Sequence, residues 1–546
     1  MAGESVPAGR KPYNPRAMFN ILIPDDLSEA GLEVLRRDPN VHVDVVKKMP
    51  RAELLERIAA YHALIVRSDT KVDAEVIARA EKLRVIGRAG IGVDTIDVDA
   101  ATHRGIIVMN TPQANTTATC EHTMAMMLAL ARNIPQADAS LRRGEWTRSK
   151  FMGVQLYGKT LGIIGLGRIG TQVARRAQGF GMEVLAYDPY VSEETARTNK
   201  VLLVSLDELL AQSDFVTLHS SLTPGTRGLL DAAAIAKMKP GARVINVARG
   251  ALVDIQALYE ALASGKLAGA ALDVFEEEPP PPDLPLLKLP NVVVTPHLGA
   301  STAEAQRDVS IQIAEQVLDA LHERDVRNAV NFPPIDPSAW PIIRPYLTLA
   351  EKLGRLQACL MEGRLTRVEV EYRGADVAPH VKPLTVALLR GLLEPILGGE
   401  KVNYVNAPVI ADERGIVVTQ ALNLTGSDYT NLVSCRITTD HSEHTVAGTL
   451  FDGNQPRIVQ LDHFRIDAVP EGLVLVISSR DVPGVIGRVG TVLGANYVNI
   501  AEYRLGRTRP GDRALSFINL DNPVPEYALK ALRDLPEVFW AKQISL

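Results

Sequence analysis

The sequence predicts a multidomain α/β protein with two doubly wound parallel-sheet domains, the second inserted into the first, followed by two smaller α+β domains. Short apolar runs alternate with helix-like stretches in two successive series before residue 300, which is the rhythm of parallel sheets. Hydrophobic residues make up 46 % of the chain but aromatics only 5 %, as expected for aliphatic strands buried between helices. A length of 546 residues is enough for three or four domains.

Charge and cysteine content exclude several classes of protein. A net charge of −5 argues against a nucleic-acid binder, which needs a basic surface. No apolar run approaches the roughly 18 residues of a membrane span, and residues 1–17 are too polar for a signal peptide. The three cysteines, Cys120, Cys359 and Cys435, lack metal-site or redox spacing. We therefore expect a cytoplasmic protein without a metal, and a disordered extension over residues 1–17.

The first α/β series covers residues 18–112, with strands expected at 20–23, 63–66 and 85–87. Helices are expected between these strands, over 27–38 and 51–61.

A later helix is expected to return the chain to this domain. Val309, Ile313, Val317 and Leu321 recur every four residues, and Ser301 with Glu304 predicts a capping box before them. Residues 300–330 then complete a discontinuous first domain.

The second α/β series covers residues 113–299 and predicts six strands with helices between them, typical of a doubly wound sheet that binds a dinucleotide. The expected strands are 160–165, 183–187, 215–219, 243–247, 269–273 and 292–295.

The remaining chain predicts a linker and two further domains. Residues 331–345 contain five prolines and are interpreted as a stiff linker. Residues 346–468 form a domain with an expected strand at 368–372 and a helix at 384–392. Residues 472–546 follow the order strand, helix, strand, strand, helix, strand, which is typical of the ferredoxin-like fold.

A glycine motif marks a cofactor site. Gly165, Gly167 and Gly170 lie between an apolar strand and a helix, with Arg168 and Ile169 inside the motif. Such glycines permit a tight turn, close approach of a pyrophosphate and close helix packing. Asp188 ends the next strand, where it would accept hydrogen bonds from ribose hydroxyls and repel a 2′-phosphate. We therefore expect NAD rather than NADP.

Polar residues follow three later strands. Arg249, Glu278 and His297 each come just after an apolar strand, so they can converge at the carboxyl edge of the sheet. Arginine suits a carboxylate, and a histidine oriented by a carboxylate suits removal of a hydroxyl proton before hydride transfer. Taken singly, each residue could instead be a surface charge or a capping group.

Four segments carry a resemblance to a known family: 165–170, Asn246–Gly250, Asp273–Pro279 and Pro296–Ala300 resemble the D-isomer-specific 2-hydroxyacid dehydrogenases. The resemblance makes Arg249 the ligand of the substrate carboxylate, His297 the acid/base and Glu278 its partner, with Glu276 and Glu277 excluded because the family glutamate directly precedes the proline. It also implies further cofactor contacts at Ser220, Val247, Ala248, Arg249, Asp273, His297, Gly299 and Ala300.

Three further segments, Val66–Lys71, Gly87–Asp94 and Glu145–Phe151, resemble the substrate loops of certain members of that family. Those members oxidise 3-phospho-D-glycerate to 3-phosphooxypyruvate, the first step of L-serine biosynthesis. The implied substrate residues are Arg67, Ser68, Arg88, Ala89, Gly90, Arg148 and Arg249. Several arginines suit a phosphorylated substrate, although one of Arg67, Arg88 and Arg148 could be structural. Alternatives are a glyoxylate or hydroxypyruvate reductase, a 2-hydroxyglutarate dehydrogenase, or a nucleotide-sensing interaction protein.

Residues 346–468 resemble the intervening domain of the long forms of the family. In the C-terminal domain, Arg480–Gly487 and Val498–Ala501 resemble an ACT regulatory domain. By that resemblance Asp481 and Asn499 would bind an effector such as L-serine. The resemblance also implies a homodimer or homotetramer.

Overall fold

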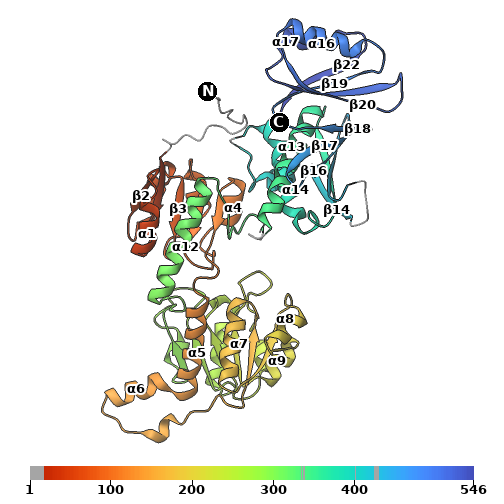
Figure 1. Ribbon diagram of the computed structural model, residues 1–546. Coiled ribbons are helices and arrows are strands. Elements are labelled where there is room, and N and C mark those ends of the chain that lie inside the picture. Colours follow the sequence, from red (N-terminus) through yellow and green to blue (C-terminus); the bar gives the residue numbers. More distant parts are fainter. Residues whose placement is uncertain (1–17, 334, 336–338, 400, 424–428) are drawn as a thin grey trace.

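The computed structural model describes residues 18–333, 335, 339–399, 401–423 and 429–546. The extension predicted over residues 1–17 lies outside the described residues. Four sheets follow one another along the chain, and the predicted fold class is confirmed (Figure 1). No helix of the described residues is long and apolar enough to cross a bilayer.

The first sheet is parallel, in the order β2-β1-β3-β4-β5. The three expected strands are present, and two short ones were missed. The missed β2 is a half-exposed edge strand, and β5 at the other edge has only three residues. The elements are β1 (Phe19–Ile23), α1 (Glu29–Arg36), β2 (Val41–Val45), α2 (Arg51–Arg57), β3 (Ala63–Val66), α3 (Ala74–Arg79), β4 (Val85–Arg88), α4 (Val98–His103) and β5 (Ile107–Met109).

Helix α12 (Ala303–Leu321) packs on this first sheet, as predicted (Figure 1). A Cβ on Gly87 of β4 would stand 2.7 Å from Val317, so the helix lies directly on the strand. The predicted capping box is wrong. Thr302 caps the helix and accepts the Ala305 N–H, because the helix begins later than the Ser301 pattern requires.

The second sheet is also parallel and has the order β12-β11-β10-β9-β6-β7-β8. All six expected strands are present, and the two-residue β8 was missed because it is too short to give a pattern. The elements are α5 (Thr116–Arg132), α6 (Ile134–Arg142), β6 (Thr160–Ile164), α7 (Arg168–Gly179), β7 (Glu183–Tyr187), α8 (Glu193–Thr198), β8 (Leu202–Leu203), α9 (Leu206–Gln212), β9 (Phe215–Leu218), α10 (Ala232–Lys237), β10 (Arg243–Asn246), α11 (Ile255–Ala263), β11 (Gly269–Leu272) and β12 (Val292–Val294).

The proline-rich stretch differs from its prediction at one end. Helix α13 (Trp340–Leu360) begins inside the expected linker 331–345, with Pro341 in its first turn. A proline is tolerated there because the first helical N–H groups have no partner within the helix. The last part of the stretch is therefore helical rather than a linker.

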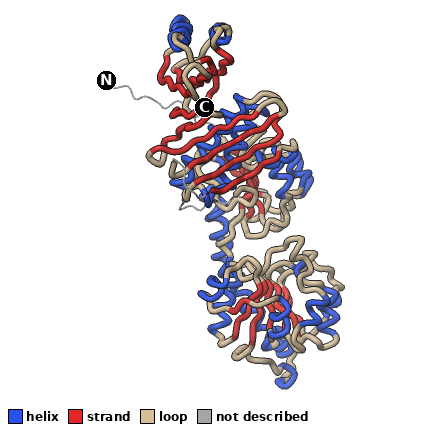
Figure 2. Tube along the Cα trace, turned by 90° about the vertical axis from the view of Figure 1, so that its right-hand side faces the viewer, coloured by secondary structure: helices blue, strands red, loops and turns tan. Residues whose placement is uncertain are grey.

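The third domain contains a mixed six-stranded sheet in the order β14-β13-β15-β16-β17-β18, seen as side-by-side strands in Figure 2. Gly354 and Gly391 let α13 and α14 approach closely, since a Cβ on Gly354 would meet Leu388 O at 2.1 Å. The elements are α13, β13 (Leu365–Arg373), α14 (Val381–Leu397), α15 (Ala407–Glu413), β14 (Val417–Asn423), β15 (Leu432–Thr439), β16 (Glu443–Phe451), β17 (Gln455–Leu461) and β18 (Phe464–Ala468).

The C-terminal domain has the predicted βαββαβ order and the sheet β20-β21-β19-β22. Val476 and Phe517 of this sheet belong to the same buried core as Leu353 of α13, so the last two domains share one core. The elements are β19 (Leu473–Arg480), α16 (Val485–Ala495), β20 (Ile500–Arg507), β21 (Arg513–Leu520), α17 (Glu526–Arg533) and β22 (Val538–Ser545).

Candidate active site

The turn between β6 and α7 forms a cradle. Gly165 has φ +97°, and a Cβ there would meet Ser220 N at 2.8 Å. A Cβ on Gly170 would stand 2.1 Å from Gly165 O, so only glycine permits this packing. Gly167 caps α7 and has open space around it, where a pyrophosphate can approach the helix N-terminus.

Asp188 lies beside this turn at the end of β7. Its Oδ2 accepts the Leu166 N–H at 2.9 Å and its Oδ1 accepts the Tyr190 N–H at 2.9 Å. The carboxylate is thus fixed next to the cradle and keeps further lone pairs for ribose hydroxyls. Arg168 is exposed in the first turn of α7, and Ile169 beside it is half-buried. These residues fit a bound NAD.

His297 and Glu278 contact each other directly. The Nδ1 atom of His297 lies 2.7 Å from Glu278 Oε2, and Glu278 Oε1 accepts the Phe275 N–H at 3.0 Å. Burial raises the pKa of Glu278, but the hydrogen bonds from His297 and Phe275 outweigh it and lower that pKa. An ionised Glu278 holds the proton on Nδ1, which leaves Nε2 free to accept a proton.

The two preceding glutamates do not take this role. Glu276 forms an ion pair with Arg227 at 2.6 Å, whereas the imidazole of His297 contacts Glu278. The choice of Glu278 over its neighbours agrees with this geometry.

Asp273 anchors the loop that carries His297. Its buried carboxylate accepts the N–H groups of Leu298 at 2.7 Å and Gly299 at 2.9 Å, while its carbonyl accepts the His297 N–H at 2.8 Å. His297 itself has φ 54°, an uncommon conformation for a non-glycine residue that such contacts must hold. The role of Asp273 seen here is to position this loop.

The other expected cofactor residues lie at the same edge of the sheet. Ser220 contacts the carbonyl of Ile164 at 3.2 Å, beside the glycine turn. Val247 packs against Gly299, where a Cβ would stand 3.1 Å from Val247 Cγ1. Ala248 follows β10, and the Ala300 carbonyl accepts a hydrogen bond from Gln306 at 2.9 Å.

Arg249 crosses to the first domain. Its Nε donates to Asp94 Oδ2 at 2.7 Å and its Nη1 donates to the Ala248 carbonyl at 2.7 Å. Gly92 lies directly against the guanidinium, since a Cβ there would overlap Nη2. The guanidinium therefore sits between the two domains.

Arg88 lies close enough to both Arg67 and Arg249 to feel their charges. Burial, together with the positive charges of Arg67 and Arg249, lowers the pKa of Arg88 to about 10. The Nη1 of Arg88 donates to Ala89 O at 2.8 Å, whereas its buried Nε has no partner. The unpartnered Nε of Arg88, with the positive charges of Arg67 and Arg249 nearby, favours the binding of an anion here.

The backbone around these arginines is well anchored. Asp25 accepts the Arg67 N–H and, at 2.6 Å, the Thr70 hydroxyl, which fixes the loop that contains the exposed Ser68. Ala89 and Gly90 are buried, and the Gly90 carbonyl accepts the Thr111 N–H at 2.9 Å.

Arg148 is exposed in the segment after α6. Helix α6 projects from the second domain in Figure 1. The role of Arg148 in substrate binding stays a prediction.

Asp481 and Asn499 lie apart from each other. Asp481 follows Arg480, which pairs with Arg513 at the start of β21, whereas Asn499 precedes Ile500, which pairs with Leu520 at its end. Asp481 and Asn499 therefore lie near opposite ends of β21, about the length of the strand apart. Within one chain, the two side chains cannot bind the same small effector. Asp481 faces Arg507 at 3.5 Å and Asn499 donates to Asp521 at 2.6 Å.

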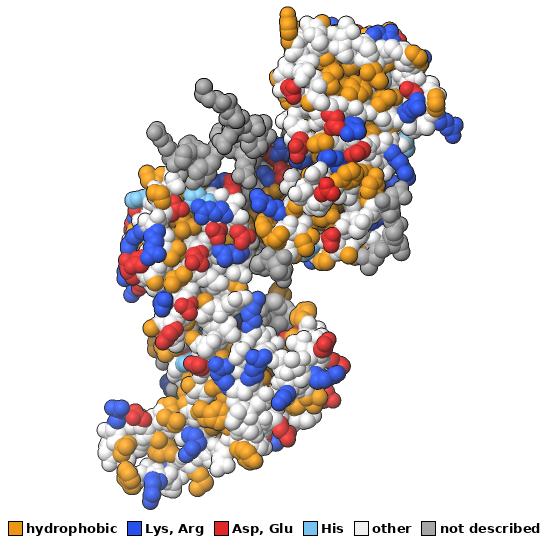
Figure 3. All heavy atoms as spheres, in the orientation of Figure 1, with side chains coloured by type: hydrophobic (Ala, Val, Ile, Leu, Met, Phe, Trp, Pro, Cys, Tyr) orange, Lys and Arg blue, Asp and Glu red, His pale blue; other side chains and the backbone are white. Residues whose placement is uncertain are grey.

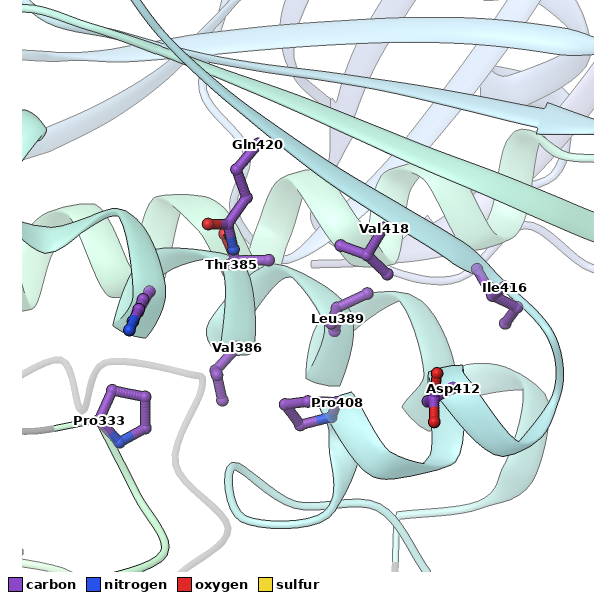
Figure 4. A pocket seen from close by; sticks show the side chains of 10 residues that line it. Pro333, Thr385, Val386, Leu389, Pro408, Asp412, Ile416, Val418 and Gln420 are labelled. Carbon is purple, nitrogen blue, oxygen red and sulfur yellow. The ribbon is translucent and has the colours of Figure 1, made fainter. Parts of the chain in front are cut away.

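A separate cavity of about 390 Å³ lies in the third domain between α14, α15 and β14 (Figure 4). Val386, Leu389 and Val418 form its apolar side, and Pro333 closes one end. None of the sequence-predicted site residues lines it.

Sequence reasoning missed the residues that support the site. Asp25, Asp94 and His122 contact Arg67, Arg249 and Asp273 respectively, and none was given a role; Asp94 ends the segment Gly87–Asp94 that resembles a substrate loop, whereas Asp25 and His122 lie in no recognised motif. A position directly after a strand, as for Asp25 after β1, is the one signal that could have found it. Among the described residues no group of three or more acidic, histidine or cysteine side chains could hold a metal.

Fold and geometry together define a nicotinamide-dependent dehydrogenase of 2-hydroxy acids, and comparison with known proteins agrees. Residues 124–299 match the NAD-binding domain of the D-isomer-specific 2-hydroxyacid dehydrogenases. Residues 342–462 match the D-3-phosphoglycerate dehydrogenase intervening domain, and residues 473–537 match an ACT domain.

Relatives and solved structures narrow the class. The chain is 46 % identical over 530 residues to the D-3-phosphoglycerate dehydrogenase of Archaeoglobus fulgidus, covering 97 % of this chain and all of that protein. It is 42 % identical over 529 residues to the enzyme of that name from Bacillus subtilis, covering 97 % and 100 %. A glyoxylate reductase from Paecilomyes thermophila, 33 % identical, superposes with TM-score 0.54 over 57 % of this chain and 98 % of its own. The chain therefore belongs to the D-3-phosphoglycerate dehydrogenase family.

Proposed function

We propose that the protein oxidises 3-phospho-D-glycerate to 3-phosphooxypyruvate with NAD, the step that begins L-serine biosynthesis. The observation that carries the proposal is that Arg249, Glu278 and His297 follow three neighbouring parallel strands, while Arg88 lies within reach of the charges of Arg249 and Arg67. Such an arrangement suits a substrate that bears both a carboxylate and a phosphate. Relatives that bear the corresponding name cover nearly the whole chain.

The residues of the chain divide the reaction between them. Arg249 holds the substrate carboxylate and polarises the 2-oxygen, and the buried Arg88 with Arg67 holds the phosphate. His297 Nε2 takes the hydroxyl proton, while Glu278 stabilises the imidazolium through Nδ1. The Gly165–Gly170 turn and Asp188 would hold NAD, which would supply the hydride acceptor for the carbon that bears the hydroxyl group.

A substrate comparison tests this proposal. The wild-type enzyme is supplied with NAD and with 3-phosphoglycerate, D-glycerate or 2-hydroxyglutarate, and NADH formation is followed. The proposal expects kcat/KM for 3-phosphoglycerate to exceed that for D-glycerate by at least about a hundredfold, because two charge-assisted contacts to the phosphate are at stake. Equal rates on D-glycerate, or faster rates on 2-hydroxyglutarate, would reject it.

The alternative of a glyoxylate or hydroxypyruvate reductase is favoured by one observation, the similarity of the first two domains to a glyoxylate reductase. That protein matches only 57 % of this chain, and Arg67 and Arg88 would have no phosphate to bind with such a substrate. Reduction of glyoxylate faster than of 3-phosphooxypyruvate by NADH would favour this alternative.

We further infer that the protein works as a homodimer or homotetramer. The segment around α6 exposes large apolar side chains, including Leu141, Trp146 and Met152, which are 56 %, 75 % and 84 % exposed. Figure 3 shows apolar side chains among charged ones on this projection. Exposed apolar groups at one projection mark an association surface. Because Arg148 follows α6, a second copy could carry it to a substrate site. Sedimentation of the wild type and of Trp146→Ser tests this assembly.

The C-terminal domain is proposed to bind an amino-acid effector such as L-serine. Since one chain cannot bring Asp481 and Asn499 together, the effector site would be built from two chains. NADH formation with and without L-serine, in wild type and Asn499→Ala, tests this.

We also assign the protein to the cytoplasm, supported by cysteines that are all free; cell fractionation tests that assignment.

A further inference from the structure

His122 contacts residues that anchor the loop carrying His297, and the mechanism above does not use it. It lies on α5, and its side chain is 19 % exposed. Its Nε2 atom lies 3.2 Å from Asp273 Oδ1 and 3.1 Å from Thr295 Oγ1. The Thr295 hydroxyl donates to Asp273 Oδ1 at 2.6 Å, so both atoms facing the imidazole are acceptors. His122 must therefore carry its proton on Nε2 and donate it.

The carboxylate that receives this proton is fully buried. Asp273 has no exposed surface and accepts four donors: His122, Thr295, Leu298 N–H and Gly299 N–H. A buried carboxylate keeps its charge only when its lone pairs are satisfied. Two of these donors belong to the His297 loop, and His122 is the donor that comes from a helix outside it.

Helix α5 contacts this loop along one face. Thr119, His122 and Met126 follow a helical spacing. Thr119 Cγ2 lies 3.6 Å from the Cβ position of Gly299, and Met126 Sδ lies 3.6 Å from Thr295 Oγ1. The face thus runs from the start of the helix to the strand that precedes His297.

We propose that His122 is a positioning residue: by donating to Asp273 and Thr295 it fixes the carboxylate that holds the His297 loop, and so sets the place of the catalytic imidazole. This inference rests on the proposed function. It predicts that loss of the donor slows the proton transfer at His297 without weakening substrate binding.

The test uses the full-length enzyme with NAD and 3-phosphoglycerate. His122→Leu, which keeps the volume and removes the donor, is expected to lower kcat about tenfold while KM for 3-phosphoglycerate changes less than about twofold. His122→Gln, which restores an N–H near the place of Nε2, is expected to recover kcat to within about threefold of wild type.

His444→Leu is the matched control. His444 is also 19 % exposed and lies 3.1 Å from the carboxylate of Asp462, but in the third domain. It is expected to keep the wild-type kcat. If His122→Leu does not fold, His122→Asn replaces it, because the shorter amide cannot reach Asp273 and should stay slow beside His122→Gln.

The outcomes separate cleanly. An inactive wild type rejects the proposed substrate and not the role of His122. An active wild type overturns the inference if His122→Leu retains its kcat, if His122→Leu and His122→Gln lose kcat equally, or if the loss lies in KM alone.

Discussion

Glu278 and His297 come from loops after two neighbouring strands, β11 and β12, and meet at 2.7 Å between Oε2 and Nδ1. The other oxygen of the Glu278 carboxylate accepts the Phe275 N–H. This backbone contact fixes Glu278, and Glu278 in turn orients the imidazole of His297. The contact determines which nitrogen of His297 is free for the substrate.

Replacing Glu278 with glutamine tests that contact. The amide lacks the charge that stabilises the imidazolium and can present an N–H to Nδ1, so we expect kcat to fall about a hundredfold with little change in KM. Steady-state NADH formation measures both. Glu276→Gln, two residues away and paired with Arg227 instead, should behave as wild type. Equal losses in the two variants would contradict the assignment of Glu278.

Arg249→Lys tests the carboxylate contact. A lysine cannot offer the forked pair of N–H groups, and it also loses the hydrogen bond to Asp94, so kcat/KM for 3-phosphoglycerate should fall about a hundredfold. Arg243→Lys, at the other end of β10, is the control and should keep its kcat/KM. An unimpaired Arg249→Lys would show that another group binds the carboxylate.

Asp188→Asn tests cofactor choice. The asparagine oxygen still accepts the Leu166 N–H, but the repulsion of a 2′-phosphate is removed, so the preference for NAD over NADP should fall at least about tenfold. Initial rates with each dinucleotide measure the ratio. Glu183→Gln, at the start of the same strand, should leave it unchanged. An unaltered ratio in Asp188→Asn would place the selectivity elsewhere.

Asp273 should make the stability of the enzyme pH-dependent at acid pH. Burial raises its pKa, but hydrogen bonds from His122, Thr295 and Leu298 outweigh burial and lower it. A carboxyl group whose folded pKa is depressed adds stability above its unfolded pKa of about 4, and that stability is lost as pH falls toward the folded value. The unfolding temperature of Asp273→Asn should therefore lie below wild type at pH 7, and the gap should narrow below about pH 4. A gap that is constant with pH would contradict this role.

Much of this architecture could be predicted because apolar runs and short motifs in the sequence indicate the strands and the residues that follow them. Six strands of the second sheet are apolar runs, and the glycine turn, Arg249, Glu278 and His297 stand in motifs at strand ends. Edge strands such as β2 and β8 escaped because they are half-exposed or too short to have a period. The helix start at Trp340 escaped because proline density hid it, although proline in a first turn is allowed.

Contacts between distant segments could not be predicted. Nothing local distinguishes His122, and although Asp94 ends a recognised loop, its contact with Arg249 depends on how the two domains fold against each other. Arg148, Asp481 and Asn499 stand in motifs, but a motif does not show whether its residues meet in one chain or only between chains.

The most direct measurement is NADH formation from 3-phosphoglycerate by wild type and His297→Ala at equal protein concentration, with NADH affinity measured by fluorescence. Removal of a general base predicts a kcat lower by about a thousandfold, with NADH affinity within about threefold of wild type, because His297 is replaced without disturbing Gly165–Gly170 or Asp188. A His297→Ala enzyme that turns over 3-phosphoglycerate as fast as wild type would contradict the account.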